Sequence, residues 1–140
     1  MRERLEKSCD AIEECYEFML AYAAQGLASD EGSQSGGNLR GYLTRAASAV
    51  AGLADSFTAL VKEENLQPAE KYHKFIAVLG RDASDALAAI ELVLAQPSLS
   101  SQLIDNLNAS IHVRALLTDL FLIDEIAKPR PAAPTSVNAT

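Results

Sequence analysis

Apolar residues recur along this chain at alternating spacings of three and four, a pattern that predicts long amphipathic helices. In residues 2–25 the spacings run 4, 3, 4, 3 and 4 from Leu5 onward. The same alternation continues through residues 39–64 and 68–96. A repeat that averages about 3.5 residues keeps apolar side chains on one face of a helix. Residues 99–127 also read as helical, so the chain contains four predicted helices.

Polar or proline-containing segments separate the predicted helices. Residues 29–37 are expected to form a loop rich in Ser and Gly, and Asn38 can cap the following helix through its side-chain oxygen. Pro68 suits the first position of the next helix. Short connections place consecutive helices antiparallel. We therefore expect an all-α protein, an antiparallel up-down-up-down four-helix bundle of residues 1–127 with a disordered Pro-rich C-terminal tail at residues 128–140.

Charge and composition exclude several classes of partner. The net charge of −7 disfavours binding to nucleic acid or to an anionic membrane surface. No apolar run reaches the roughly 18 residues that span a bilayer, and the charged N-terminal segment lacks the apolar core of a signal peptide. Cys9 and Cys15 lie six residues apart on one predicted helix, too far for a disulfide. We expect reduced thiols and a cytoplasmic location.

The last predicted helix carries a charged residue on its apolar face. At about 100° per residue, Arg114 shares this face with Leu107 and Leu117. The first helix passes in the opposite direction and brings Glu13 to the same height. We expect a half-buried Arg114–Glu13 ion pair, assisted by Tyr16. Such a pair can fix the register of the bundle, or Arg114 can hold a carboxylate or phosphate ligand in the core. Alternatively, the guanidinium snorkels to water.

A second apolar stripe runs along the first and last predicted helices. Its residues are Cys15, Phe18, Tyr22, Leu116, Leu120 and Ile123. Part of this stripe can seal the groove between the two helices. However, residues 116–123 are apolar at every position except Thr118 and Asp119, and a helix that is apolar nearly all round is normally buried all round. Because a two-fold interface uses one patch twice, the stripe predicts a homodimer through these two helices.

The first predicted helix also has a broad acidic side. Its carboxylates are Glu3, Glu6, Asp10, Glu13, Glu14 and Glu17. Such a side is either a solvated surface or a docking site for a basic partner, and salt would weaken the binding in the second case.

The two histidines give little evidence of a metal or phosphate chemistry. His73 follows Glu70 at the Glu-x-x-His spacing of di-iron bundles, which need two such units and further inward carboxylates. His112 lies opposite the apolar face of its helix, as a phosphotransfer histidine would, but the Lys and Gly that usually follow such a histidine are missing. We predict no metal site, no cofactor and no catalytic set.

Two classes of function follow from these observations. The first is a non-enzymatic interaction module, an adaptor, chaperone-like or regulatory protein that acts as a homodimer and has a possible protein partner. The second is a small-ligand-binding protein or enzyme with a site in the bundle core near Arg114.

Overall fold

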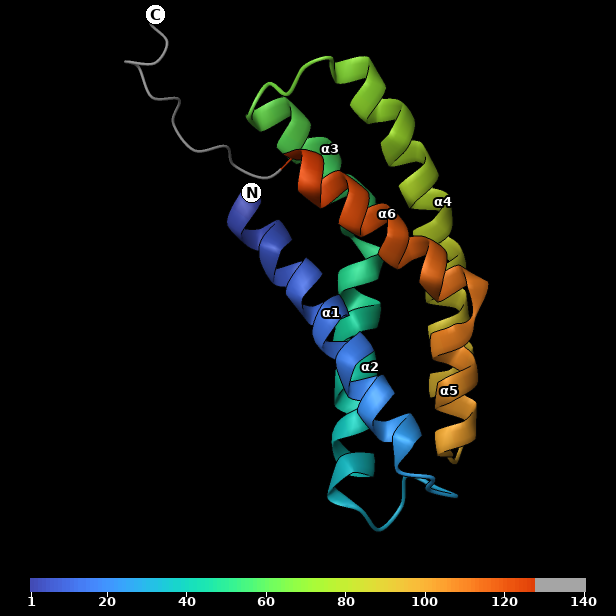
Figure 1. The fold of residues 1–140 in the computed structure, drawn as a ribbon. Helices are drawn as coiled ribbons and strands as arrows, with labels where there is room; N and C mark the ends of the chain where they lie inside the picture. Colours follow the sequence, from blue (N-terminus) through green and yellow to red (C-terminus); the bar gives the residue numbers. More distant parts are fainter. Residues whose placement is uncertain (128–140) are drawn as a thin grey trace, which may run out of the picture.

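Six helices and their connections make up residues 1–127, the part of the chain that the computed structural model describes (Figure 1). They are α1 (Arg2–Ala24), α2 (Gln34–Ala51), α3 (Leu53–Glu63), α4 (Ala69–Leu94), α5 (Ser101–Ala109) and α6 (Ile111–Ala127). No strand occurs within residues 1–127. The prediction of an all-α protein is confirmed, whereas the predicted tail at residues 128–140 lies outside the described residues.

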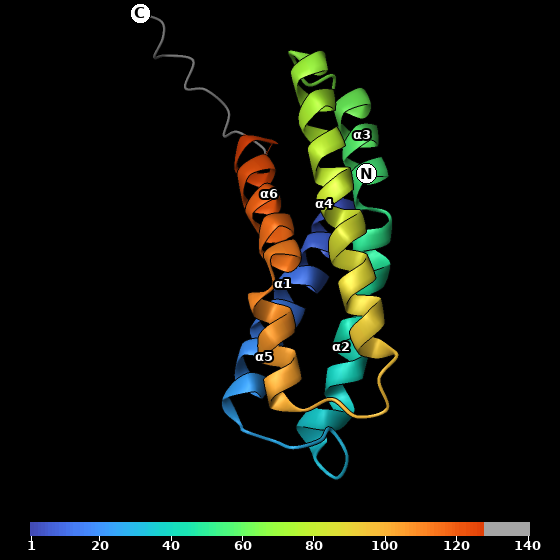
Figure 2. The same ribbon diagram turned by 90° about the vertical axis from the view of Figure 1, so that its right-hand side faces the viewer.

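The helices pack around one apolar core to which all six contribute. α1 contacts α2, α3 and α5, while α4 contacts α2, α3, α5 and α6. Figures 1 and 2 show α2 and α3 following one another along one side of the molecule, and α5 and α6 along another. Figure 2 also shows α6 and α4 separating toward the C-terminal end of α6.

The second predicted helix is interrupted at Gly52. This residue has φ −103° and ψ 6°, and its N–H donates to the carbonyl of Val50 instead of continuing the regular helical pattern. A glycine inside a helix costs about 1 kcal/mol relative to alanine because it restricts the unfolded chain so little. The interruption is local, since Ser56 N–H donates to the carbonyl of Gly52 and starts α3.

Replacing Gly52 by alanine is expected to raise the free energy of unfolding by about 0.5–1 kcal/mol. A Cβ at this position would meet no atom within 4 Å, and its φ is open to any residue. Urea denaturation measures the effect. Gly26→Ala is the control, because φ is +66° there and the same substitution should destabilise. A loss of stability in Gly52→Ala would show that the break itself is required.

The last predicted helix is broken at Ser110. Its ψ of 144° is extended, and its Oγ accepts a hydrogen bond of 3.3 Å from Val113 N–H. Serine at the start of a helix satisfies a backbone N–H in this way, which favours a new N-terminus over continuation. α5 and α6 are therefore separate helices, and of the apolar face predicted through residues 99–127, Leu107 and Leu117 are buried whereas Arg114 is exposed.

α2 begins earlier than predicted. Its N-cap is Ser33, whose Oγ accepts a hydrogen bond of 2.9 Å from Gly36 N–H. The predicted loop at residues 29–37 is therefore partly helical, and Asn38 lies inside the helix instead of capping it. Gly36 is buried against the backbone of Asp30, and only glycine allows this approach.

A buried ion pair closes the end of the molecule near the start of α2. Asp30 accepts hydrogen bonds of 2.8 Å from Arg40 Nε and from Leu99 N–H. Arg40 also donates to the carbonyls of Leu94, at 3.1 Å, and Gln96, at 2.9 Å. Burial alone would raise the pKa of Asp30, but these two donors and the guanidinium charge outweigh burial and lower it. The pair thus joins the α1–α2 connection to α2 and to the α4–α5 connection.

Candidate functional site

The six residues predicted as a dimer interface lie within the chain's own packing. They are Cys15, Phe18, Tyr22, Leu116, Leu120 and Ile123. All except Phe18 are at most 2% exposed. Phe18 is half-buried and its ring stacks on Tyr42 with centroids 4.4 Å apart, and the Tyr22 hydroxyl donates to the carbonyl of Leu99 at 2.6 Å. Five of these residues are therefore buried within the single chain, Phe18 packs on Tyr42, and the homodimer interface stays a prediction.

The physical reason lies in the direction that α6 takes after Ser110. The apolar stripe containing Leu116, Leu120 and Ile123 faces the core. Phe121, on another side of the same helix, is 55% exposed. On α1 both stripes are needed within one chain, because this helix has neighbours on more than one side.

The predicted Arg114–Glu13 pair is corrected. Arg114 is exposed, Glu13 and Tyr16 are half-buried, and no ion pair joins Arg114 to Glu13. Burial, and then the carboxylates of Asp10 and Asp124, raise the pKa of Glu13, the reverse of what a paired guanidinium would do. Among the described residues, the ion pair with a buried carboxylate is instead the one between Asp30 and Arg40, which sequence reasoning missed.

A small cavity lies in the core beside Tyr16, one of the three residues of the predicted ligand site. The cavity beside Tyr16 has a volume of about 20 Å³ and is lined by residues such as Met19, Val50 and Ile90. This is space for about one water molecule. Neither Arg114 nor Glu13 lines this cavity, so the three residues predicted as a ligand site do not surround it together.

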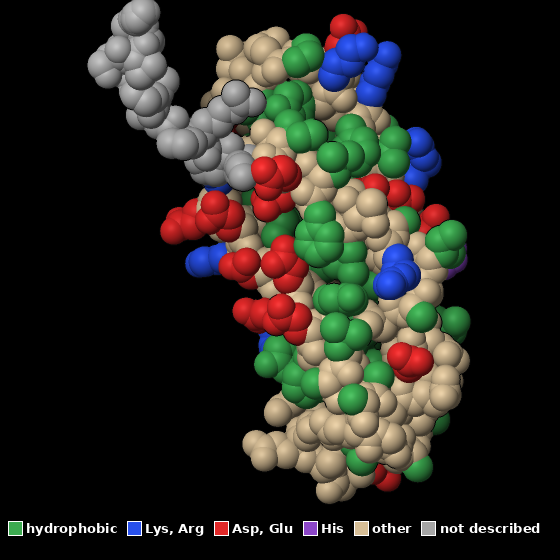
Figure 3. Space-filling model, in the orientation of Figure 1, with side chains coloured by type: hydrophobic (Ala, Val, Ile, Leu, Met, Phe, Trp, Pro, Cys, Tyr) green, Lys and Arg blue, Asp and Glu red, His purple; other side chains and the backbone are tan. Residues whose placement is uncertain are grey.

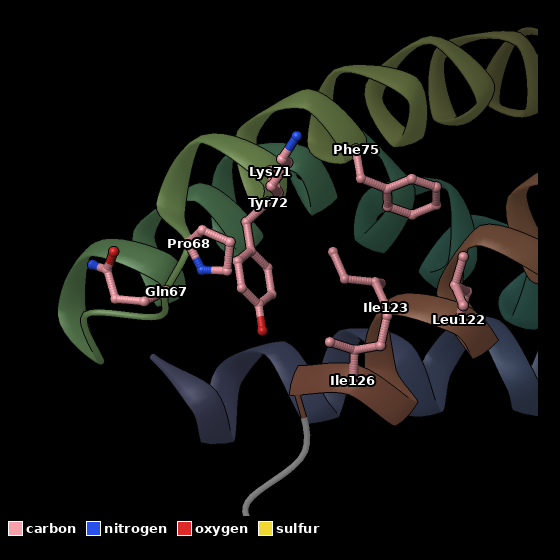
Figure 4. Close-up of a pocket in the computed structure, with 8 residues that line it drawn as sticks. All are labelled: Gln67, Pro68, Lys71, Tyr72, Phe75, Leu122, Ile123 and Ile126. Carbon is pink, nitrogen blue, oxygen red and sulfur yellow. The ribbon is translucent and has the colours of Figure 1, made fainter.

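A larger apolar groove lies between the N-terminal end of α4 and the C-terminal end of α6. Its volume is about 440 Å³. The lining residues are Gln67, Pro68, Lys71, Tyr72, Phe75, Leu122, Ile123 and Ile126. Figure 4 shows Tyr72 from α4 and Ile123 from α6 projecting toward the same space. The groove forms where α4 and α6 separate, and each of these two helices supplies one of its walls.

The α6 wall of this groove continues onto an exposed apolar surface. Leu122 is 49% exposed and Ile126 is 51% exposed, and Phe121 lies beside them on the same helix. Figure 3 shows apolar side chains forming a nearly continuous strip on this face of the molecule. Contiguous apolar patches of this kind mark binding surfaces more often than scattered single residues do.

An acidic ridge runs beside that strip. We define it by its five carboxylates, which are Glu6, Asp10, Glu13, Glu17 and Asp124. Within the described part of the chain no ion pair joins any of them to a cation. Burial raises the pKa of the nearby Cys9 thiol to about 12, and the ridge carboxylates add to the effect. Figure 3 shows acidic side chains gathered along one edge of the apolar strip.

A second pair of carboxyl groups lies between α4 and α6. Asp119 is 8% exposed, and its Oδ2 is buried without a hydrogen-bond donor. The half-buried Asp82 of α4 lies within hydrogen-bonding reach of it. Burial, and then the hydrogen bond and charge of Asp82, raise the pKa of Asp119 to about 7. Two carboxylates this close cannot both be ionised without strong repulsion.

The other candidate groups offer no chemical site. Cys9 and Cys15 are buried free thiols, and burial raises the pKa of Cys15 to about 12, so neither is an activated nucleophile. His73 and His112 are exposed. Among the described residues no group of three His, Cys, Asp or Glu side chains is arranged to hold a metal ion. In the same part of the chain no helix combines the length and apolarity needed to cross a membrane.

The contact between Asp119 and Asp82 could have been suspected from one feature of the sequence. Asp119 interrupts an otherwise apolar run. A carboxyl group at such a position either faces solvent or requires a polar partner in the protein interior. Nothing in the periodicity, however, distinguishes Leu122 and Ile126 as exposed wall residues from the core residues beside them.

Comparison of the chain with family models, with curated proteins and with solved structures found no match in any of the three.

Proposed function

We propose that this protein is a non-enzymatic interaction module, an adaptor or regulator that binds a basic amphipathic helix of a partner protein. The partner helix inserts its apolar face between α4 and α6 and directs lysine or arginine side chains to the acidic ridge. The observation that carries this proposal is the apolar groove of about 440 Å³ with half-exposed Leu122 and Ile126 on its wall.

The shape of the groove favours a helix as its occupant. Leu122 and Ile126 stand one helical turn apart on α6, opposite Tyr72 and Phe75 on α4. Amphipathic helices enter such grooves through anchor side chains three or four residues apart, which match this spacing. Burying two or three such anchors contributes several kcal/mol of gross binding energy, of the order of 1.5–3 kcal/mol per large aliphatic side chain.

The charge beside the groove favours a basic partner over a second copy. Within residues 1–127 no ion pair joins the five ridge carboxylates to a cation, although the charge of Arg2 acts on Glu6 and Asp124, and the chain carries a net charge of −7. A basic helix compensates this charge, and complementary charges speed association. A two-fold pairing of the same face would bring two acidic ridges toward each other, at a cost in electrostatic repulsion.

We further propose that α2 with α3, and α5 with α6, serve as two rods of an antiparallel four-helix bundle, with α1 and α4 as the other two. The helix contacts and the two ribbon views support this arrangement. The two free, buried cysteines are compatible with a reducing compartment such as the cytoplasm.

A designed peptide tests the function. A helical peptide of leucine and lysine, with leucines at three- and four-residue spacings, is expected to bind the full-length protein by fluorescence anisotropy. The double variant Leu122→Asp/Ile126→Asp should weaken this binding at least tenfold, because each charge faces the apolar anchors of the peptide. Raising the salt concentration should also weaken it.

Matched controls separate groove binding from general attraction to an acidic protein. Ile111→Asp changes a 74% exposed residue that does not line the groove, so it should leave the affinity unchanged. A leucine–glutamate peptide of the same length should not bind. Equal losses in Ile111→Asp and the double variant, or equal binding of the acidic peptide, would refute the proposal. A concentration-dependent dimer that the double variant abolishes would identify a second copy as the occupant.

A further inference from the structure

The Asp82–Asp119 contact continues the two walls of the groove toward the middle of the molecule. On α4, Tyr72, Phe75 and Asp82 follow one another at helical spacing along one edge. On α6, Asp119 precedes Leu122 by three residues, so both lie on the edge that faces α4. The carboxyl pair therefore lies along the same edges of α4 and α6 as the groove walls, about two helical turns from Phe75 and one turn from Leu122.

We propose that a proton on Asp119 bridges the Asp119 and Asp82 carboxyl groups across the α4–α6 contact, and that loss of this proton separates the two helices and widens the groove. This regulation rests on the proposed function of the groove as a binding site. With the proton present, one carboxyl donates to the other and holds α6 against α4. Without it, two carboxylates face each other where water cannot screen them, and the helices move apart at this point.

The buried position of Asp119 supplies the geometric basis for this inference. Its Oδ2 has no hydrogen-bond donor within the described residues, which is a costly state for a buried carboxylate. A proton on Asp119 removes the deficiency, because the protonated oxygen becomes a donor. The proton thus completes a contact that is otherwise unsatisfied.

No other charged group stabilises the ionised form of Asp119. On α4, Arg81 and Asp85 flank Asp82 but are exposed, and Asp105 of α5 is exposed as well. On α6 itself, Arg114, His112 and Asp124 are exposed. The carboxylates of α1 act on Asp124, about 140° round the helix from Asp119. Asp82 is the group whose charge acts on Asp119.

The direction of the pH effect follows from the raised pKa. The pKa of Asp119 lies above its ordinary value because burial, and then Asp82, disfavour the ionised form. A group of this kind contributes its stabilisation fully below its unfolded pKa, near 4, and loses it as pH rises through the folded pKa of about 7. The α4–α6 contact should accordingly be tight at pH 6 and loose at pH 8.5.

Two measurements on the full-length protein test the inference. Nile red, an uncharged apolar dye, is expected to bind the groove with fluorescence that rises between pH 6 and pH 8.5 in the wild type and stays flat in Asp119→Asn. Hydrogen exchange at residues 119–126 should be at least about threefold faster in the wild type than in the variant at pH 8.5, and equal at pH 6. Comparison at one pH cancels the intrinsic pH dependence of exchange.

The outcomes separate this inference from the function on which it rests. Asp82→Asn should reproduce the behaviour of Asp119→Asn, which guards against an effect of one substitution on folding. Equal dye and exchange profiles in the wild type and both variants would overturn the inference, as would a transition removed by added Ca²⁺, since a cation would then be the occupant. A pH-dependent groove to which no basic peptide binds would overturn the proposed function and leave this inference intact.

Discussion

Replacing Arg40 by methionine is expected to lower the free energy of unfolding by about 3 kcal/mol at pH 7. The substitution leaves the buried Asp30 carboxylate without its guanidinium, and it also removes the donors to the carbonyls of Leu94 and Gln96. Methionine keeps most of the apolar stem, so lost packing contributes little. The Arg40 side chain is 35% exposed, which places the expected loss at the lower end of the range for buried pairs. Chemical denaturation at several pH values measures it.

Arg114→Met is the matched control for this prediction. Arg114 is exposed and unpaired with Glu13, so its loss should change stability by less than about 0.5 kcal/mol. Adding Asp30→Asn to Arg40→Met should recover part of the loss, because the uncompensated charge is then gone. The lowered pKa of Asp30 also fixes the direction of the pH dependence. The ionised carboxylate stabilises the folded protein above the pKa that Asp30 has in the unfolded chain, and this stabilisation is lost as pH falls through the lower pKa of the folded state. Equal losses in Arg40→Met and Arg114→Met would contradict the assignment.

The long helices could be predicted from the sequence because their periodicity extends over many turns. α1 and α4 begin and end within one or two residues of the predicted limits. The helix breaks at Gly52 and Ser110 could not be predicted, because a single residue hardly disturbs the alternating three- and four-residue spacing of apolar positions. Each break depends on local hydrogen bonds, such as the one from Val113 N–H to the Ser110 hydroxyl.

The candidate site depended on the second break and was therefore missed. Once α6 starts afresh at Ile111, tertiary packing decides which of its apolar stripes faces the core. Leu116 and Leu120 lie inside, whereas Phe121 and Leu122 lie outside, although both sets fit a helical repeat. Hydrophobicity alone does not distinguish them, since α6 is apolar over most of its circumference. The groove arises from this choice together with the divergence of α4 and α6.

The same helix holds the residue that conflicts most with its surroundings. The buried positions of α6 favour apolar side chains, yet Asp119 is buried there and lies opposite the carboxyl group of Asp82. Conflicts between local chemistry and the fold gather at functional sites, because the rest of the structure has to compensate for them. The conflict and the exposed groove wall occupy neighbouring turns of one helix, which is the reason for treating them as one site.

Replacing Gly36 by alanine is expected to lower the free energy of unfolding by about 3 kcal/mol. The added Cβ would overlap the backbone carbonyl of Asp30, and a backbone group cannot turn aside as a flexible side chain can. Relief requires the start of α2 to move away from the α1–α2 connection. That shift would also strain the hydrogen bonds from Arg40 Nε and Leu99 N–H to the Asp30 carboxylate, since both depend on the position of the same residue.

The neighbouring glycine supplies the control for this last prediction. Gly37 lies in the same first turn of α2, but a Cβ there would meet nothing within 4 Å. Gly37→Ala should therefore raise the free energy of unfolding by about 0.5–1 kcal/mol through helix propensity alone. Thermal denaturation of the two variants should move in opposite directions from the wild type. If Gly36→Ala were as stable as Gly37→Ala, the close packing of α2 on Asp30 would not exist, and the argument for the Asp30–Arg40 pair as an end clamp would weaken with it.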